Sequence, residues 1–177
     1  MRSTIFAVAL LLGTPAWADI ITVDFEELEA GYPTSFVSKG VNFTSDFGFG
    51  AQVGGPGSEF GSYVLGLVAD AENSLSMASG VSFDLISWDV RIGIVDMTVT
   101  GFLESGGTVS TTISSTSGAL ETYNFSSAWT GLTSVQFTVG DFDVLDNVVI
   151  SAVPLPAAVW LFGSALAGLG WIRRKRA

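Results

Sequence analysis

The chain contains no cysteine and no histidine, and only 7 of its 177 residues are lysine or arginine. The absence of cysteine excludes disulfide bonds and thiol nucleophiles. The absence of histidine excludes a Ser-His-Asp triad and, together with the missing cysteine, removes the usual ligands of zinc and copper. A bound metal would therefore have to be a hard cation held by oxygen atoms.

Positive charge is scarce and stands mostly at the two ends, in Arg2 and in the run Arg173-Arg174-Lys175-Arg176. The region between them keeps two basic residues, Lys39 and Arg91, against all 17 acidic ones, which leaves a formal charge of −15. So acidic a region repels phosphate backbones, and this argues strongly against nucleic acid as a partner. It is compatible with divalent cations, with neutral polysaccharide, and equally with simple solubility outside the cell.

The first 18 residues have the features of a secretory signal peptide. Met1-Arg2 forms a short basic region, Ile5 to Leu12 is apolar, and Ala16-Trp17-Ala18 is a small-x-small cleavage site. This pattern predicts an exported protein whose mature chain begins at Asp19. A permanent N-terminal anchor is the alternative, and the shortness of the apolar stretch disfavours it.

The last 25 residues combine a proline motif, an apolar stretch and a basic end. The stretch from Ala157 to Ile172 has 16 uncharged residues. As a helix it would span about 24 Å, against roughly 30 Å for the hydrocarbon core of a bilayer. The basic residues that follow it should stay on the cytoplasmic side. This pattern predicts a C-terminal hydrophobic helix, held in the membrane before any processing.

The same residues resemble a known sorting signal, the VPLPA variant of the PEP-CTERM tail. Its motif would be Val153, Pro154, Leu155, Pro156 and Ala157. The resemblance implies processing by an exosortase, a membrane cysteine transpeptidase that removes the hydrophobic segment. It also implies a Gram-negative host that makes extracellular polysaccharide, and an inner-membrane intermediate that ends at the cell surface or in the extracellular matrix. A plain C-terminal membrane anchor is the alternative.

Residues 19–152, the length of one domain, read as β-structure almost throughout. Turn residues separate ten short segments rich in Val, Ile, Phe and Thr: 20–26, 40–44, 62–68, 74–77, 81–92, 94–103, 108–113, 120–125, 134–139 and 144–150. We predict an all-β fold, an antiparallel β-sandwich of the jelly-roll kind. Its core is expected to contain Phe83, Trp88, Phe102, Phe125 and Phe137.

Local patterns refine this prediction at three points. Gly106-Gly107 stands between two strand patterns and predicts a hairpin turn. The apolar residues before and after Leu85 are out of phase, which indicates a bulge there. Along Val135 to Val139, apolar residues alternate with Gln136 and Thr138, so these two polar side chains should share the opposite face.

Acidic residues gather near both ends of the predicted domain. Asp24-Phe25-Glu26 opens it, and a segment from Asp141 through Asp143 to Asp146 enters its last strand. These ends resemble the first and last strands of sandwich domains in exosortase-sorted proteins and in carbohydrate-binding modules. That resemblance implies a structural Ca²⁺ with Glu26 and Asp146 as ligands, and with Asp24, Asp141 and Asp143 as weaker candidates. Solvated turn carboxylates without a metal are the alternative.

The segment from Ser45 to Gly61 reads as a long loop with six glycines and three phenylalanines. Phe47, Phe49 and Phe60 would form a platform for sugar rings, with the alternative that they fold back over the core.

Three functional hypotheses follow from these patterns. The first is a non-enzymatic surface or matrix protein that binds polysaccharide or contributes to a biofilm. The second is a structural or adhesive protein whose partner is another protein or itself. The third is a small polysaccharide hydrolase, which requires a pair of carboxylates at a defined separation. No pair of acidic residues in the sequence is marked out for that chemistry.

Overall fold

The computed structural model describes residues 18–29, 31–54, 62–114, 116 and 118–152. The predicted signal peptide (apart from Ala18), the tail at 153–177 with its motif Val153–Ala157, and Phe60 lie outside these ranges. Within them, no helix has the length and apolar character needed to cross a bilayer. Ala18–Val153 forms one compact unit.

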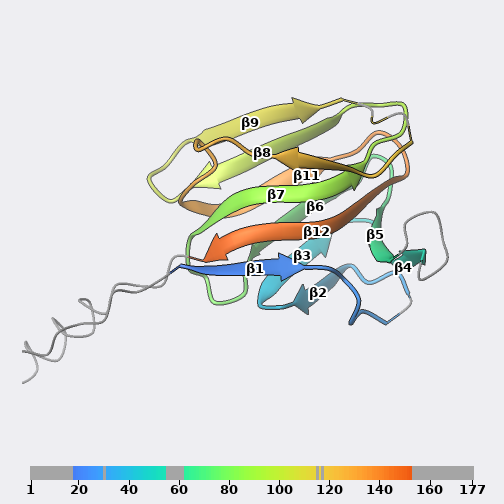
Figure 1. The fold of residues 1–177 in the computed structure, drawn as a ribbon, viewed down its shortest axis with the longest axis horizontal. Helices are drawn as coiled ribbons and strands as arrows, with labels where there is room; N and C mark the ends of the chain where they lie inside the picture. The colour runs from blue at the N-terminus through green and yellow to red at the C-terminus, as the bar shows by residue number, and fades with distance from the viewer. Residues whose placement is uncertain (1–17, 30, 55–61, 115, 117, 153–177) are drawn as a thin grey trace, which may run out of the picture. The chain divides into compact units, whose positions relative to one another are not determined.

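Twelve antiparallel strands make up the described part of this unit (Figure 1). Their bounds are β1 Asp19–Val23, β2 Ser35–Ser38, β3 Val41–Ser45, β4 Gly50–Gly54, β5 Tyr63–Leu67, β6 Glu72–Met77, β7 Phe83–Arg91, β8 Met97–Leu103, β9 Thr108–Ile113, β10 Glu121–Asn124, β11 Leu132–Thr138 and β12 Asp143–Ala152.

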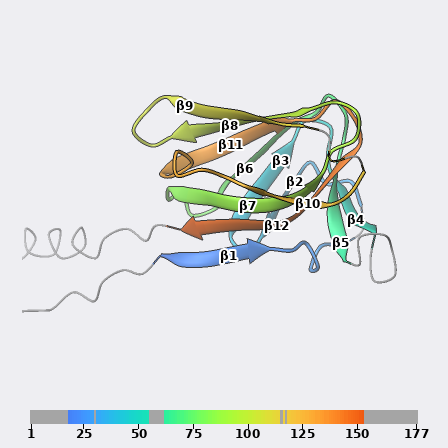
Figure 2. The ribbon, with the colours of Figure 1, turned by 45° about the horizontal axis from the view of Figure 1, so that its top comes forward.

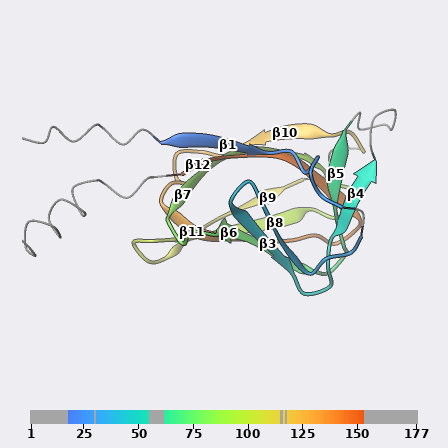
Figure 3. The same ribbon diagram turned by 90° about the horizontal axis from the view of Figure 1, so that it is seen from below.

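The strands form two layers that face each other across the core (Figures 2 and 3). One layer has the order β2-β3-β6-β11-β8-β9. The other contains β10, β7 and β12, with β1 and β5 paired to different stretches of β12 and β4 beyond β5. A single pairing, Leu132 of β11 with Phe83 of β7, connects the two layers. The predicted antiparallel β-sandwich is confirmed.

The first and last strands lie side by side, with Asp19 paired to Ala152 and Val23 to Val148. Strand β12 runs ten residues from Asp143 to Ala152. Its first residue, Asp143, therefore lies about 30 Å from the end where Ala152 pairs with Asp19. The domain therefore has one end where both its termini leave the sandwich, and an opposite end built from loops.

The core is a continuous set of aromatic and aliphatic side chains between the layers. Trp88 is wholly buried, with its ring 4.9 Å from that of Phe125 and 5.5 Å from that of Phe137. A second aromatic group joins Phe25 to Phe43 at 5.3 Å. Four of the five predicted aromatic core residues pack in or against this core; Phe102 does not, and its position is described below.

Two of the local predictions are confirmed. Gly106 and Gly107 both have φ of 87° and close the β8–β9 hairpin, a conformation that glycine adopts without steric cost. The β7–β12 pairing shifts register opposite Leu85, where Ile86 stands exposed between the buried Leu85 and Trp88.

Strands β2 and β4 are absent from the sequence-based prediction. The segment that contains β4 reads as a loop because its glycines hide the strand pattern. Pairing with β5 through Gly50, Val53 and Gly54 is what holds it extended. The prediction of one continuous loop from Ser45 to Gly61 is therefore wrong over Gly50–Gly54.

Candidate functional site

The five predicted metal ligands do not come together at one place. Asp24 forms an ion pair with Lys39 at 2.7 Å. That hydrogen bond is the main reason why the pKa of Asp24 lies below its usual value. Among the residues that the structure describes, no group of three or more acidic side chains gathers as a metal centre would require.

Glu26 and Asp146 do approach each other, on the outer face of the layer that contains β7 and β12. Asp146 accepts hydrogen bonds from the hydroxyl of Ser62 at 3.0 Å and from the backbone N–H of Asn147 at 2.8 Å. Glu26 accepts one from the N–H of Tyr63 at 2.9 Å. The structure thus shows both carboxylates as acceptors of hydrogen bonds from protein groups.

Asp146 in this cluster has a raised pKa, and burial is its main cause. It raises the pKa of Asp146 to about 6, and the charges of Asp89 and Glu26 add to the increase. The hydrogen bonds from Asn147 and Ser62 oppose it. Because Asp146 is only 1% exposed, its environment disfavours the ionised form.

The other two predicted ligands lie apart from both Asp24 and the Glu26–Asp146 pair: Asp141 is in the loop before β12, and Asp143 is the first residue of β12. Asp143 is buried and accepts a hydrogen bond from the N–H of Gly93 at 2.8 Å. Burial raises the pKa of Asp143, and the charge of Asp141 raises it further, while the Gly93 hydrogen bond and Arg91 lower it.

The predicted platform of three phenylalanines does not exist as such. Phe47 is 68% exposed, but Phe49 is wholly buried, with its ring 5.5 Å from that of Phe36. The N–H of Phe49 donates to the carbonyl of Pro33, which holds this residue against the core just before β4. Phe49 therefore belongs to the core and is a correction to the predicted ligand site, while Phe60 lies outside the described residues.

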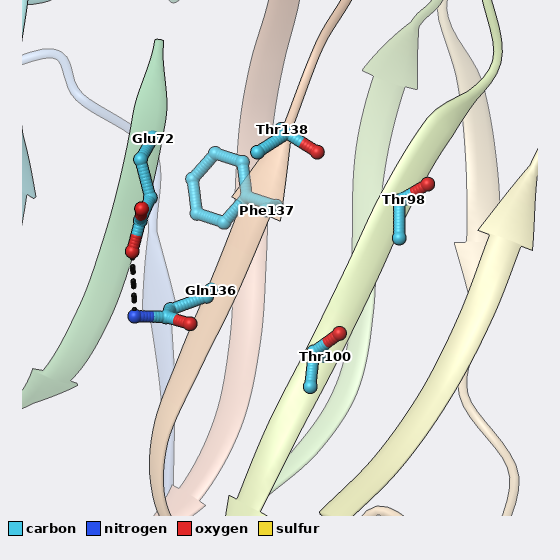
Figure 4. Close-up of a pocket in the computed structure, with 6 residues that line it drawn as sticks. All are labelled: Glu72, Thr98, Thr100, Gln136, Phe137 and Thr138. Atoms are coloured by element: carbon cyan, nitrogen blue, oxygen red, sulfur yellow. Dashed lines mark hydrogen bonds between the residues drawn. The ribbon is translucent and has the colours of Figure 1, made fainter.

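A shallow groove of about 170 Å³ lies on the outer face of the other layer, over β6, β11 and β8 (Figure 4). The residues that line it are Glu72, Thr98, Thr100, Gln136, Phe137 and Thr138. Phe137 is buried and contributes to the floor, whereas the other five bring polar groups. The side-chain amide of Gln136 donates to the carboxylate of Glu72 at 2.7 Å.

Strand register aligns these polar side chains in rows across the sheet. Gln136 lies opposite Ser74 on one side and Thr100 on the other. Thr138 lies opposite Glu72 and Thr98 in the same way. The rows extend to Thr44 on β3, whose hydroxyl is 2.6 Å from that of Ser74, and to the hydroxyl residues of β9. The result is a surface of hydroxyl and amide groups with little charge.

Phe102 lies on this polar face and not in the core. It follows Thr98 and Thr100 at the outward positions of β8, opposite Ser134 on β11 and Thr108 on β9. Its ring is partly exposed. Strict alternation along β8 is the sequence signal that predicts this placement, because Val99, Gly101 and Leu103 take the inward positions.

Of the groove residues, sequence reasoning placed only Gln136 and Thr138 on a shared outer face. The groove itself was missed because its other members come from β6 and β8. These strands lie on either side of β11 but are far from it in the sequence.

Among solved structures, the chain matches carbohydrate-binding modules. A variant of CBM29-2, a family 29 module, complexed with mannohexaose has a TM-score of 0.49 at 13% identity, over 77% of this chain and 92% of that chain. The CBM22-1 xylan-binding domain of Paenibacillus barcinonensis Xyn10C has a TM-score of 0.42 at 17% identity, over 80% and 99% of the two chains. No protein-family model matches the chain, and no curated protein is similar to it in sequence.

Proposed function

We propose that this protein is an exported, non-enzymatic surface or matrix protein that binds neutral polysaccharide along the groove over β6, β11 and β8. The observation that carries the proposal is the aligned rows of hydroxyl and amide groups around that groove. Such groups can exchange hydrogen bonds with sugar hydroxyls at little cost in desolvation.

Charge and shape favour this class of ligand over others. Glu72 is the one carboxylate among the six residues that line the groove. Glycoside hydrolysis by the usual mechanisms needs two flanking carboxylates, so binding without cleavage suits the groove better. The partly exposed ring of Phe102 lies two residues from Thr100 on the same face, where a sugar ring can stack on it. The large negative charge of the domain disfavours a polyanionic glycan.

Co-sedimentation of the 19–152 fragment with the exopolysaccharide of the producing cells tests this proposal. The double variant Gln136→Ala, Thr100→Val removes two polar side chains from the groove. We expect about a fivefold loss of affinity for each hydrogen bond removed. The matched control is Thr22→Val, which makes the same hydroxyl-to-methyl exchange on the exposed face of β1. Equal binding by wild type, double variant and control would refute the proposal.

The proposal includes sorting by an exosortase-type enzyme, which rests on the sequence of residues 153–177 alone. The mass of the C-terminal peptide of protein recovered from the producing cells is the direct test. A terminus near Pro156 or Ala157 supports cleavage and sorting, and an adduct on it would identify the attachment. An intact Ala177 would indicate a plain membrane anchor.

One observation favours the adhesive alternative. Ile94 and Phe142 are 86% and 70% exposed on two neighbouring loops, where Val95 contacts the position of Gly140. Exposed apolar residues grouped in this way are typical of protein contacts. Sedimentation of the 19–152 fragment over a range of concentrations, with Phe142→Ser as the variant, would detect self-association through this end of the sandwich.

A further inference from the structure

We propose that the outer edge of β9 (Thr108–Ile113) pairs in the antiparallel sense with the same strand of a second copy of this chain. Strand β9 lies at the rim of its layer (Figures 1 and 2). Among the strands that the structure describes, it pairs with β8 alone. Its other side is therefore an edge, where backbone N–H and C=O groups can pair with a further strand.

This edge carries none of the features that usually prevent pairing between sheets. Charged side chains, proline and β-bulges are the common ones. No charged residue and no proline occurs between Glu104 and Glu121. The pairing of β9 with β8 runs without a register shift, from Thr108 opposite Phe102 to Ile113 opposite Met97. Strand β9 therefore presents six residues of regular, uncharged backbone.

Other edge strands of the sandwich are protected by charge. Strand β1 begins with Asp19 and β10 with Glu121, and Lys39 directly follows β2. Strands β2 and β10 are also short, with four residues each. The uncharged edge of β9 is thus distinct from these three, and it is the one at which a further strand meets the least resistance.

The side chains hold β9 ready for such pairing. Valine, isoleucine and threonine, which favour extended backbone, make up five of its six residues. On its inner side, the hydroxyl of Thr111 lies 3.0 Å from the hydroxyl of Tyr123 on β10, so the strand is tied to the opposite layer. Little conformational entropy then remains to be lost when a second strand binds.

The sequence of β9 is complementary to itself in one register. If Ser110 lies opposite Ser110 of the second copy, Thr108 lies opposite Thr112 and the exposed residues of both copies share one face. Hydroxyl residues opposite each other are favourable cross-strand pairs. The row that contains Gln136, Thr100 and Ser110 would then continue into the same row of the second copy.

Charge is the reason for assigning this edge to a second copy. The domain is strongly acidic, so two copies repel each other wherever acidic surfaces meet. The strip along β9 is uncharged, and repulsion between exposed charges falls off over about 8 Å at physiological salt. Contact between copies therefore costs least here. The exposed apolar loops with Ile94 and Phe142 are a separate surface.

The contact is small, which sets its strength. One pair of six-residue strands buries less than the roughly 1,200 Å² at which stable interfaces begin. Association between free copies is therefore weak, and it increases where many copies are held together at high local concentration. The pairing does not depend on glycan binding, and either one can fail without the other.

Disulfide cross-linking of the full chain in detergent tests the pairing, because the protein has no cysteine of its own. In an antiparallel pair, residues opposite each other have Cα atoms about 4.5–5.5 Å apart, which a disulfide can span. Under mild oxidation with diamide, Ser110→Cys should form at least about fivefold more covalent dimer than Thr22→Cys, an exposed position on β1.

Two further cysteine variants test the register. In the proposed pairing, residue 112 of one copy lies about 13 Å along the strand from residue 112 of the other, too far for a disulfide. Thr112→Cys alone should therefore cross-link no more than Thr22→Cys. A mixture of Thr108→Cys and Thr112→Cys copies should form the mixed dimer, because these two positions lie opposite each other.

A charge exchange tests the same contact without a covalent bond. Ser110→Lys and Ser110→Glu each place two like charges opposite one another, so each variant alone should associate about fivefold more weakly than the wild type in sedimentation equilibrium. Mixing the two should restore association. Equal cross-linking of Ser110→Cys and Thr22→Cys, or wild-type association of Ser110→Lys, would overturn the proposal. Association lost in Phe142→Ser and kept in Ser110→Lys would place the contact at the loops instead.

Discussion

Asp146 on β12 lies directly opposite Asp89 on β7, and the side-chain amide of Asn147 donates to Oδ2 of Asp89 at 2.9 Å and to Oδ2 of Asp146 at 3.4 Å. Two like charges thus face each other across an antiparallel pair. Hydrogen bonds from Asn147 and from the hydroxyl of Thr122, which lies 2.5 Å from Oδ1 of Asp89, stabilise the two carboxylates.

Burial of Asp146, to which the charges of Asp89 and Glu26 add, predicts a pH dependence of folding stability. The pKa of Asp146 is about 6 in the folded protein against a usual value of 3.8. Above pH 3.8 the unfolded chain releases the proton readily while the folded chain retains it, so stability falls as the pH rises from about 4 to 6 and then levels off. The loss is on the order of 2–3 kcal/mol.

Urea unfolding of wild type and Asp146→Asn at several pH values measures this effect. The difference between their free energies of unfolding should change in the variant's favour across that window and be constant above it. Subtracting the two curves cancels the contributions of carboxylates whose charges do not act on Asp146, including Asp143. A difference that does not vary with pH would show that Asp146 ionises normally.

Phe47 and Phe49 should respond in opposite ways to truncation. Phe49 is wholly buried and packs against the ring of Phe36, so Phe49→Ala should cost about 3–5 kcal/mol of unfolding free energy. Phe47 is 68% exposed, so Phe47→Ala should change stability by about 0.5 kcal/mol or less. Chemical denaturation of both variants measures the contrast, and equal losses would contradict the placement of Phe49.

Gly140 leaves room for Val95 in the adjoining loop. A Cβ at Gly140 would lie 2.4 Å from Cγ1 and 2.6 Å from Cβ of Val95. We expect Gly140→Ala to destabilise the fold by about 1–3 kcal/mol. In a Val95→Gly background the same substitution should cost much less, because both contacted atoms are gone. A double-mutant cycle measures the coupling, and additive effects would contradict the contact.

Phe102 should matter for glycan binding more than for folding. If a sugar ring stacks on it, Phe102→Ala should weaken binding about three- to tenfold. Because the ring lies on the outer face, the stability of the fold should change by about 1 kcal/mol or less. The matched control is Phe142→Ala, an exposed phenylalanine on a loop, which should leave binding unchanged. Affinity electrophoresis in gels that contain the polysaccharide would compare the two, and equal mobility shifts would refute the stacking role.

Periodicity in the sequence was enough to predict the fold class and much of the strand content. The alternation at Val135, Phe137 and Val139 identifies β11, and Gly106-Gly107 identifies the turn between β8 and β9. Both signals are local, since a strand alternates its faces every residue and a tight turn needs positive φ. Strand β4 escaped prediction because its glycines carry no such pattern and pairing with β5 defines it.

The sequence by itself determined that no cysteine or histidine chemistry is available, that acidic residues are in excess, that the domain is all-β, and that the ends resemble targeting signals. Only the tertiary structure decided which side chains meet. It separated Asp24, Asp146 and Asp143 into three environments, buried Phe49, and left Phe102 partly exposed. It also aligned Glu72, Gln136 and Thr100 across three strands. The physical reason is that strand pairing joins residues distant in the chain, and its register is set by the packing of the whole core.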